Sequence, residues 1–599
     1  MKKTFTIICL ILAISFFTHS QNAAFGWAIS GGGDNGADYP LDVITDNSRN
    51  IFTVCTFSKT ASFNGITLIG SEKGSGSNYD NNLWISKISP DKTNLWHIYS
   101  NIGVVKPTAI TTTPAGDLIL TGTIRAINGA TTANASIIDA AGTVTTFTGL
   151  YKYDSDAQAF VAKFNSNGVL QWAKEFNSGK QKLKGGVATN SVASDAAGNV
   201  YVTGSFPQML VLPGSTDSIA STNVGSTSSK ASFITKLNTA TGDVVWNKTS
   251  SGGILSEVIN AITFGDDGFL YAAGTFRNAA TPVLVTIGNK SFTPSSGYDL
   301  MLMKLDTDGN ISYIQNRTSV SETRVKDIIV KNGIICLAAS IKGDNVGVTF
   351  SDGQCITTLT TFNALIAAFD TSNGSDKWHK TVLAPGISET LGLTFGIDNR
   401  LYTYGYHSNK LGTSPAADVI FGDGFTLAPL SYVSGYDAFL ASYDVTNGAT
   451  KEVHLVASGT DMEMGISICA SGEKLYLLGE YKSAPSTFEG GSTISTSGGF
   501  DFFLANYVVT DKTSGNLSPS NSNDLYGYSD NINKQIIVKN RARKLIFLEL
   551  FDVTGKCLIK ESTKNERINL STKQISSGIY ILKVTSNGIL SNTQRVFVK

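Results

Sequence analysis

The sequence predicts an all-β chain: a seven-bladed β-propeller of four-stranded blades closed by an N-terminal strand, followed by a small Ig-like β-sandwich. Glycine is abundant, at 59 of 599 residues, proline is scarce, at 13, and aromatic residues make up 10%. That composition is typical of many short strands joined by tight turns. A pair of hairpins also recurs along the chain, which predicts repeated sheets rather than one large core.

The clearest copies of the two hairpins lie side by side in the sequence. The first, residues 160–176, has two apolar strands around the turn Asn165-Ser-Asn-Gly168, and the second, residues 190–206, turns at Asp195-Ala-Ala-Gly198. Such turn residues between apolar runs indicate antiparallel hairpins. We name the predicted strands by these copies: A (192–194), B (199–206), C (160–164) and D (169–176).

A tryptophan marks most copies of strand D. Its slot recurs every 65–76 residues and holds Trp27, Trp96, Trp172, Trp246, Tyr313, Trp378 and Val453. Units of about 40–75 residues with four strands are propeller blades, which bury their faces by stacking around an axis. The first D strand, 25–30, has no A, B or C strand before it, and the last C strand, 500–508, has no D strand after it. We therefore predict that Trp27 completes the seventh blade, because this closure pairs two otherwise exposed edges.

The links between strands predict where a specific site would lie. The A–B and C–D links are short, whereas the B–C and D–A links are longer and share the opposite face of the propeller. The B–C links carry an insert that we predict to be part of the blade, at Phe63-Asn-Gly65, Val285-Thr-Ile-Gly288, Phe350-Ser-Asp-Gly353, Phe421-Gly-Asp-Gly424 and Phe488-Glu-Gly490. The least regular links, 124–158 and 407–436, are the better places for a specific site, since loops carry function.

The chain divides into four predicted parts. Residues 1–20 are a signal peptide, because Lys2 and Lys3 precede an apolar run, Phe5 to Phe17, that is short for a membrane span. Residues 21–510 form the propeller, residues 511–523 a polar linker and residues 524–599 a C-terminal sandwich of short strands. We expect no transmembrane segment in the mature chain.

Charge and cysteine content narrow the class of protein. Residues 21–521 carry a net charge of −9 and residues 522–599 carry +7. An acidic body disfavours nucleic acid as a partner, because phosphate binding needs a basic surface. The five mature cysteines are too few for a disulfide scaffold; Cys336 and Cys355 lie in one repeat and either form a disulfide or remain two buried thiols.

Two resemblances follow from these motifs. The hairpin Asp195–Gly204, of the form Asp-x-x-Gly-Asn-x-Tyr-x-x-Gly, and the Asp-Ala-Phe-x-x-Lys-like strand C resemble bacterial β-propeller repeats of the SBBP type over residues 25–510. That resemblance implies a fold but no single activity and no catalytic residue. Tyr313 and Val453 depart from the tryptophan slot.

The tail resembles the C-terminal sorting domain of the type IX (Por) secretion system. The matching stretches are 550–559, 575–584 and the basic last strand, with Asp552, Gly555, Gly578, Tyr580 and Lys599 as the residues that carry the pattern. The usual Tyr-Pro-Asn-Pro opening is absent. The resemblance implies a Gram-negative bacterium, type IX machinery as a partner, export through the periplasm and removal of the tail. The body is then either released or attached to surface lipopolysaccharide.

Single residues suggest no cofactor. His97, His379 and His454 directly follow the tryptophan slot on outer strands of separate blades, so with His407 they do not predict a shared metal site. Asp306-Thr-Asp308-Gly-Asn310 could bind calcium, but its position favours a C–D turn. Asp80, Asp299, Asp437 and Asp501 recur just before strand C, which favours a strand-start role over acid–base chemistry. Four tyrosines could stack on sugar rings: Tyr151, Tyr153, Tyr432 and Tyr436. The alternative is that they have no binding role, because tyrosine is common on β-sheet surfaces.

The predicted function is therefore a non-enzymatic binding protein, such as an adhesin, on the cell surface or in the medium. The alternative is a secreted hydrolase or lyase acting on polysaccharide, and a second alternative is a passive surface scaffold. Fold alone does not choose among them. Carboxylates clustered at the axis would favour the enzyme, whereas an axis lined by small and apolar A-strand residues would favour binding. The ligand, a glycan or a protein, is not specified by the sequence.

Overall fold

The structure is a computed structural model with two compact units, Met1–Val509 and Thr510–Lys599. It describes residues 23–598 except 34–37, 71–81, 128–132, 151–156, 179–185, 222–228, 253–255, 278–282, 296, 320–321, 343–347, 351–360, 410–415, 429–434, 497–498, 510–524, 531–534, 541–545, 553–555, 566, 577 and 587–588. The predicted signal peptide and linker lie outside these residues. The described residues form strands and turns but no helix. Among them there is therefore no helix long and apolar enough to cross a membrane.

Seven antiparallel sheets of the first unit share the strand order A–B–C–D. Sheet 1 contains β2 (Tyr39–Thr45), β3 (Ile51–Phe57), β6 (Asn82–Ile88) and β7 (Asn94–Ile102); sheet 2 contains β8 (Val104–Thr112), β9 (Leu118–Arg125), β12 (Gln158–Phe164) and β13 (Leu170–Phe176). Sheet 3 contains β14 (Ala188–Ser194), β15 (Val200–Phe206), β18 (Ala231–Leu237) and β19 (Val244–Ser251); sheet 4 contains β20 (Ser256–Phe264), β21 (Leu270–Arg277), β24 (Tyr298–Leu305) and β25 (Ile311–Arg317).

The remaining sheets repeat this order. Sheet 5 contains β26 (Glu322–Lys331), β27 (Ile334–Lys342), β28 (Phe362–Asp370) and β29 (Asp376–Val382); sheet 6 contains β30 (Ser388–Phe395), β31 (Leu401–His407), β34 (Asp437–Tyr443) and β35 (Thr450–Ser458). Sheet 7 contains β36 (Glu463–Ser471), β37 (Lys474–Tyr481), β40 (Asp501–Val509) and β1 (Ala23–Gly32).

The middle strands of each sheet are almost entirely buried. In β15 and β18, for example, every residue is buried, so side chains on both faces pack against neighbours. This explains why strands B and C carry apolar residues at both odd and even positions rather than alternating strictly, since a strand covered on both faces gains from apolar residues on either face. The first strands, β2, β8, β14, β20, β26, β30 and β36, contact one another in a closed ring, so strand A is innermost.

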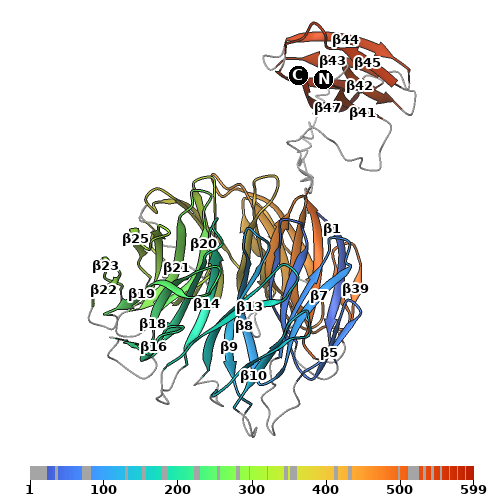
Figure 1. Ribbon diagram of the computed structural model, residues 1–599. Coiled ribbons are helices and arrows are strands. Elements are labelled where there is room, and N and C mark those ends of the chain that lie inside the picture. The colour runs from blue at the N-terminus through green and yellow to red at the C-terminus, as the bar shows by residue number, and fades with distance from the viewer. Residues whose placement is uncertain are drawn as a thin grey trace, which may run out of the picture. The chain divides into compact units, whose positions relative to one another are not determined.

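The N-terminal strand completes the last sheet, as predicted. In β1, Trp27 pairs with Asn506 and Gly31 with Phe502 of β40, in antiparallel register. Figure 1 shows the blue β1 beside the orange strands of the same sheet. Rings reinforce the pairing, because Phe25 lies 5.7 Å from Phe488 and 5.8 Å from Tyr507 between centroids. The unpaired D strand and the unpaired C strand of the sequence therefore cover each other's edges.

The inserts in the B–C links form short hairpins: β4–β5 (Thr60–Phe63, Ile66–Ile69), β10–β11 (Ala135–Ile138, Val144–Phe147), β16–β17 (Met209–Val211, Ser218–Ala220), β22–β23 (Val285–Ile287, Lys290–Phe292), β32–β33 (Val419–Gly422, Phe425–Leu427) and β38–β39 (Ser486–Phe488, Thr493–Ile494). We expected these inserts to be part of their own blade, and this expectation was wrong. They pair with strand D of the preceding sheet: β4 with β1, β10 with β7, β22 with β19 and β38 with β35. Single bridges make the same connection within two residues of the ends of β13, β25 and β29: Asn177–Val211, Ser319–Val348 and Leu383–Ile420.

In their described residues, the links 124–158 and 407–436 each contain one of these hairpins, β10–β11 or β32–β33. One further expectation about the links needs correction: the D–A links are not uniformly long, since Gly103 alone joins β7 to β8. Gly103 takes a φ of 73°, the left-handed conformation that glycine adopts without strain, which makes so short a connection feasible.

The second unit consists of two small antiparallel sheets. One has the order β41 (Leu525–Asp530), β42 (Gln535–Asn540), β45 (Arg567–Ser571), and the other β44 (Cys557–Thr563), β43 (Ile546–Phe551), β46 (Gly578–Ser586), β47 (Ile589–Val598). Apolar side chains from β42, β43, β45 and β46 form one core, with Ile536, Leu548 and Leu582 fully buried. The unit therefore has its own hydrophobic core.

The alternative of a disulfide at Cys336 is not supported. Cys336 is a free, buried thiol on β27, and burial raises its pKa far above the usual value for cysteine. Its proposed partner, Cys355, lies outside the described residues. Cys336 thus behaves as a small apolar residue of the core.

Candidate functional site

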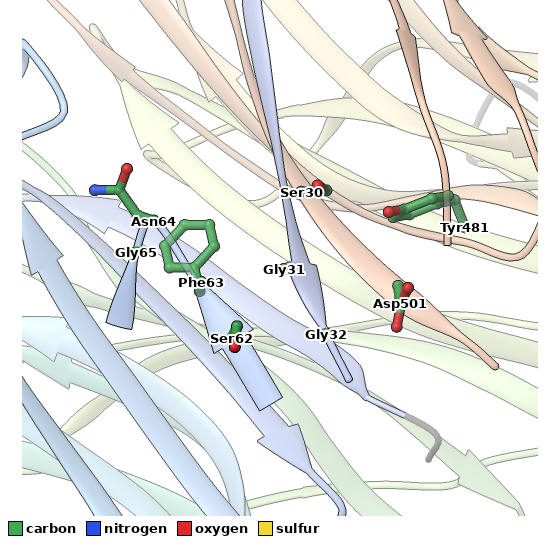
Figure 2. Close-up of a pocket in the computed structure, with 9 residues that line it drawn as sticks. All are labelled: Ser30, Gly31, Gly32, Ser62, Phe63, Asn64, Gly65, Tyr481 and Asp501. Carbon is green, nitrogen blue, oxygen red and sulfur yellow. The ribbon is translucent and has the colours of Figure 1, made fainter. Parts of the chain in front are cut away.

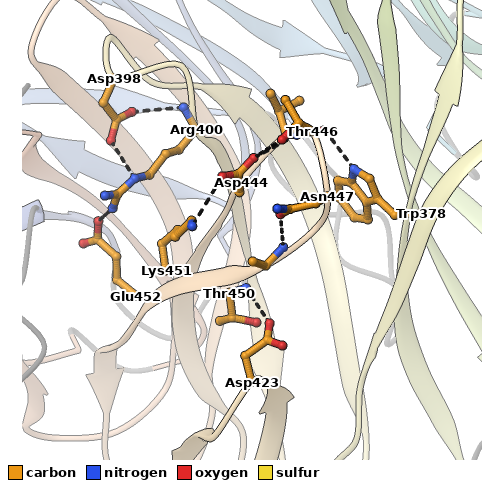
Figure 3. A network of polar contacts seen from close by, with 12 residues as sticks. Trp378, Asp398, Arg400, Asp423, Asp444, Thr446, Asn447, Thr450, Lys451 and Glu452 are labelled. Carbon is orange, nitrogen blue, oxygen red and sulfur yellow. Dashed lines mark hydrogen bonds and ion pairs between the residues drawn. The ribbon is translucent and has the colours of Figure 1, made fainter. Parts of the chain in front are cut away.

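The repeated tryptophans contact the next sheet rather than a common pocket. Four of the five donate the indole N–H to a backbone carbonyl oxygen in the following C–D turn: Trp96 to Ser166 at 3.1 Å, Trp172 to Thr239 at 3.1 Å, Trp246 to Thr307 at 3.0 Å and Trp378 to Val445 at 2.8 Å. Figure 3 shows the bond from Trp378 to this turn, whose Asp444 and Asn447 side chains cap backbone N–H groups. The recurrence of tryptophan in this slot thus reflects a contact between sheets.

The exceptions in the slot keep part of this contact. Tyr313 reaches the carbonyl oxygen of Thr371 with its hydroxyl group at 3.4 Å, so tyrosine replaces tryptophan with another donor. Trp27 lies under the ammonium group of Lys92, which is 5.3 Å from its ring. Val453 has no polar side-chain atom and so makes no such bond.

Lysines of strand C add a second bond to the same turns. Lys163 donates to the carbonyl oxygen of Thr239 at 3.0 Å and forms an ion pair with Asp117 at 3.0 Å. Lys87 and Lys304 make equivalent bonds to Ser166 and Thr371. These cations are therefore engaged in structural contacts and are not free to bind an anionic ligand. The sequence shows these lysines at the end of strand C, but only the structure connects them with the tryptophans.

The seven innermost strands share one irregularity, and the residues that follow it are mostly small. Every strand A carries a β-bulge, and the residues just after it are Asp42, Ala109, Ser191, Ala261, Asp327, Gly392 and Ser467. The two carboxylates among them bond to a neighbouring sheet: Asp42 accepts from the Ser467 hydroxyl of sheet 7 at 2.7 Å, and Asp327 accepts from the Leu393 N–H of sheet 6 at 2.8 Å. Bulges of this kind re-aim a side chain, here across the joint between two sheets.

The two carboxyl groups in this ring are electrostatically unusual. Burial raises the pKa of Asp42 to about 6 and that of Asp327 to about 7, and the charge of Asp42 adds to the shift at Asp327. Two perturbed carboxyl groups can indicate acid–base catalysis. Here each already accepts a hydrogen bond that joins neighbouring sheets, and the other five positions hold alanine, serine or glycine. Asp42 and Asp327 are therefore used in contacts between sheets.

Of the aspartates near the start of strand C, Asp299 secures the strand start, as expected. Asp299 accepts bonds from the N–H groups of Ser295 at 2.7 Å and Ser319 at 2.8 Å, and from the side-chain amide of Asn316 at 2.8 Å. It thereby ties the D–A link to β24. Asp437 and Asp501 are the first residues of β34 and β40, and burial raises the pKa of Asp437 to about 7. Asp80 lies outside the described residues.

The histidines do not converge. His97, His379 and His454 lie on β7, β29 and β35, the D strands of sheets 1, 5 and 6. His379 stacks on Phe350 at 4.2 Å between ring centroids. Asp306 caps its own turn by accepting from the N–H groups of Asp308 and Asn310. Within the part of the chain that the structure describes, we find no group of three metal-ligating side chains.

His454 belongs to a buried charge network between sheets 6 and 7. Its Nε2 lies 3.1 Å from Glu452 and its Nδ1 lies 3.0 Å from Glu489, which follows β38. Burial alone would lower the pKa of His454, but the two carboxylates outweigh burial and raise this pKa to about 9. The Tyr507 hydroxyl also donates to Glu489, at 2.8 Å, and Arg400 forms an ion pair with Glu452 (Figure 3). His454 is therefore a charged structural residue.

One pocket lies beside the closing strand and is shown in Figure 2. It has a volume of about 220 Å³ and is lined by Ser30 and Gly32 of β1, Asn64 of the first insert, Tyr481 and Asp501, among others. A Cβ atom at Gly32 would lie 2.0 Å from Asp501, so the glycine is required for the close approach of the strands. These features fit a tightly packed seam between sheets.

A second pocket, which we call the sheet 4–5 pocket, has a volume of about 310 Å³. It is lined by Val258, Asn260, Thr275 and Tyr298 of sheet 4 and by Glu322, Thr323, Arg324, Val325 and Lys326 of sheet 5. They lie in the first half of strand A, at the start of strand C or near the end of strand B. The pocket is therefore on the face that carries the B–C and D–A links and lies next to the inner ring.

Of the four tyrosines proposed for sugar stacking, the structure describes only Tyr436. Tyr436 directly precedes β34, and its ring lies 5.0 Å from that of Tyr406 on β31. The Tyr406 hydroxyl donates to Glu389 at 2.6 Å, so Tyr436 is near the inner ring on the same face as the sheet 4–5 pocket. Tyr151, Tyr153 and Tyr432 lie outside the described residues.

In the second unit, the residues that carry the sorting pattern are structural. Asp552 accepts from the Lys556 N–H at 3.0 Å and so caps the turn between β43 and β44. Tyr580 is buried on β46, and its hydroxyl donates to the carbonyl oxygen of Ser576 at 2.7 Å. Gly578 is the first residue of β46, while Gly555 and Lys599 lie outside the described residues.

Residues 530–599 match the family model described as the secretion system C-terminal sorting domain. They carry the type IX sorting domain that the tail motifs predicted, which marks an exported protein handled by the type IX secretion machinery. Such a domain supports secretion or export to the cell surface. No curated protein matches this chain.

Solved structures show only weak similarity. A Dyadobacter fermentans protein of unknown function is 7% identical, with a TM-score of 0.34, and the alignment covers 82% of this chain and 100% of that one. The quinohemoprotein alcohol dehydrogenase of Comamonas testosteroni is 10% identical, with a TM-score of 0.32 and coverage of 86% and 80%. Likenesses at this level say nothing of the activity of this chain.

Proposed function

We propose that this chain is a cell-surface or secreted binding protein, such as an adhesin, with a cleavable C-terminal sorting signal. Its body, residues 21–510, is a seven-bladed β-propeller of the SBBP type in which β1 closes the ring. Residues 1–20 are the signal peptide for export to the periplasm, residues 511–523 are the linker, and residues 524–599 are an Ig-like domain. After removal of this domain the body is released or attached to surface lipopolysaccharide.

The observation that carries the proposal is the sorting domain at residues 530–599. A chain with this domain is addressed to the outside of the cell, where the body acts. Two features of the body support closure: the seven innermost strands contact one another in a ring, and β1 pairs with β40. A closed propeller lacks the long open edges that lead to aggregation, which suits a protein exposed outside the cell.

Binding is favoured over catalysis by the residues near the axis. The sheet 4–5 pocket offers a mixed polar and apolar surface, whereas Asp42 and Asp327 are bonded to neighbouring sheets. No observation among the described residues specifically supports the hydrolase or lyase alternative. A passive scaffold would need no pocket on the link-bearing face.

The experiment is a binding screen of residues 21–510 against immobilised glycans and surface proteins, with assays for release of reducing sugar in parallel. The proposal predicts saturable binding of at least one glycan or protein without turnover. Turnover of a polysaccharide would contradict it in favour of the enzyme. A well-folded body that binds nothing would contradict it in favour of the scaffold.

A further inference from the structure

The sheet 4–5 pocket presents an aromatic ring whose position is fixed by a neighbouring cation. The guanidinium carbon of Arg277 lies 4.8 Å from the centre of the Tyr298 ring, and its Nη1 donates to the Tyr298 hydroxyl at 3.1 Å. Tyr298 therefore lines the pocket in a defined orientation and with its hydroxyl group already bonded. Fixed aromatic rings contribute contact area at little cost in conformational entropy.

Four charged groups in and beside this pocket form two ion pairs, and Arg277 adds a cation that bonds to the neutral Tyr298 hydroxyl. Arg324 donates from Nε at 2.8 Å and from Nη2 at 2.6 Å to Glu322 Oε1. Lys326 forms an ion pair with Glu389 at 3.2 Å. Burial would raise the pKa of Glu389, but the charge of Lys326 and the Tyr406 hydroxyl outweigh burial and lower it, so Glu389 is ionised. A charged ligand would have to compete with these pairs, whereas a neutral ligand can use their remaining hydrogen-bonding positions.

The other residues that line the pocket are either apolar or polar and uncharged. Val258 and Val325 contribute apolar area, and Asn260, Thr275 and Thr323 contribute neutral donors and acceptors. Pockets for small molecules combine apolar walls with a few well-placed polar groups and usually measure about 300–1,000 Å³. At about 310 Å³ this pocket suits a small ligand. A sugar ring has matching chemistry, with apolar C–H faces and hydroxyl groups at its edge.

Contacts lead from the pocket to a second aromatic pair. Lys326 bonds to Glu389, Glu389 accepts from the Tyr406 hydroxyl, and Tyr406 lies against Tyr436 at 5.0 Å. All four side chains lie on the link-bearing face, near the inner ring. The route joins sheets 5 and 6, so it offers positions for further units of a chain-like ligand beyond the pocket.

We infer that the sheet 4–5 pocket binds a neutral sugar unit of an oligosaccharide, whose next units extend over Lys326 and Glu389 toward Tyr406 and Tyr436. Tyr298 packs against the sugar ring, while Glu322, Arg324 and Asn260 bond to its hydroxyl groups. The inference deepens the proposed function and rests on it, because it names the ligand class of a binding body.

The test uses residues 21–599 and isothermal titration calorimetry with four hexasaccharides: maltohexaose, cellohexaose, xylohexaose and the acidic hexagalacturonate. The inference predicts that at least one neutral probe binds and that the acidic probe binds more weakly. Tyr298→Ala should weaken binding about tenfold or more, equivalent to about 1.4 kcal/mol. Tyr298→Phe should retain most of the affinity, because the hydroxyl group is bonded to Arg277 rather than to the sugar.

The matched control is Tyr39→Ala. Tyr39 begins strand A of sheet 1 on the same face, is 40% exposed and is not among the residues lining the pocket. Its replacement should leave the affinity unchanged, and circular dichroism melts of all variants check folding.

The outcomes separate this inference from the proposed function. Binding only of hexagalacturonate, or neutral binding that Tyr298→Ala leaves intact in a folded protein, would overturn the inference. Binding of none of the four probes would overturn it too, while the proposed function would stand if the screen found a protein ligand.

Discussion

The indole N–H of Trp172 donates a hydrogen bond of 3.1 Å to the carbonyl oxygen of Thr239, which lies 67 residues further along the chain, in the next sheet. Beneath the same ring lies Gly242, where a Cβ atom would be 2.7 Å from the indole. The tryptophan of one sheet therefore makes two contacts with the turn of the next sheet: a hydrogen bond from its indole N–H and close packing of its ring on a glycine. This relationship, repeated at Trp96, Trp246 and Trp378, explains why the residue recurs.

We predict that Trp172→Phe destabilises the body by about 1–2 kcal/mol, because it removes the donor and part of the packed ring. Trp172 is only 9% exposed, so replacing it leaves a packing defect in the core between the two sheets. Urea unfolding at fixed pH measures the change. The control is Val245→Ala, at a position 53% exposed on the next strand D, which should change stability by less than about 0.5 kcal/mol. Equal effects of both variants would contradict the role of the tryptophan.

The glycine beneath the ring offers a second test. Gly242 and Gly268 both have left-handed backbones, with φ of 70° and 76°, but a Cβ at Gly268 would meet nothing within 4 Å. Alanine at either position has a similar backbone cost of roughly 1 kcal/mol. Gly242→Ala should therefore be more destabilising than Gly268→Ala, since only the former displaces Trp172. If the two melting temperatures are the same, the ring does not depend on this close approach.

A pH dependence follows from His454. Its pKa is raised to about 9 in the folded protein, above the usual value of 6.5, so folding favours the protonated form. This contribution, on the order of 3 kcal/mol, is fully present below pH 6.5 and is lost as the pH rises through about 9. The groups that face the imidazole are Glu452, Glu489 and the ring of Tyr507.

Chemical unfolding of the wild-type protein and of His454→Gln between pH 6 and 10.5 measures this effect. The variant should be less stable at pH 7, because Glu489 and Glu452 lose a buried cation, and the difference should shrink above pH 9. His97→Gln is the control, on the equivalent strand of sheet 1, where burial lowers rather than raises the pKa of the histidine. A stability difference between His454→Gln and wild type that does not vary with pH would rule out a charged His454.

Removal of residues 21–32 tests the closing strand. The deletion strips β1 from β40 and removes Phe25 from its contacts with Phe488 and Tyr507. We expect the melting temperature to fall by several degrees and the exposed edge to promote self-association. A synthetic peptide of residues 21–32 should restore the melting temperature, whereas a scrambled peptide should not. An unchanged melting temperature after deletion would show that β1 contributes little to closure.

Much of the fold could be predicted from the sequence, because its signals are local and repeated. Tight turns, apolar strand pairs and the tryptophan slot define one sheet, and the unpaired strands around Trp27 and Phe502 predict the closure. The destination of the inserts could not be predicted. A short hairpin such as β4–β5 has the same local pattern whichever edge it joins, and only the neighbouring sheet decides that it pairs with β1.

The candidate pocket was missed for a related reason. Tyr298, Asn260 and Arg324 come from three strands in two sheets, and no motif links them. The alternating Glu322, Arg324 and Lys326 place charges on one side of a strand start, which is the one local signal that could have drawn attention to the region. The alternation does not reveal that Glu389 of the next sheet neutralises Lys326. Tyr436 was identified from its residue type, but its neighbour Tyr406 was not.

The central claim is that the C-terminal unit addresses a body that folds without it, and deletion of residues 524–599 tests this claim most directly. The two units are separately compact, and the match to the sorting domain covers residues 530–599. In a bacterium with a type IX system, cell fractionation with an antibody against the body measures where the truncated protein accumulates. We predict a protease-resistant, folded body in the periplasm and little on the surface or in the medium, and the same for deletion of β47 alone. Normal amounts of truncated protein outside the cell would contradict the sorting role.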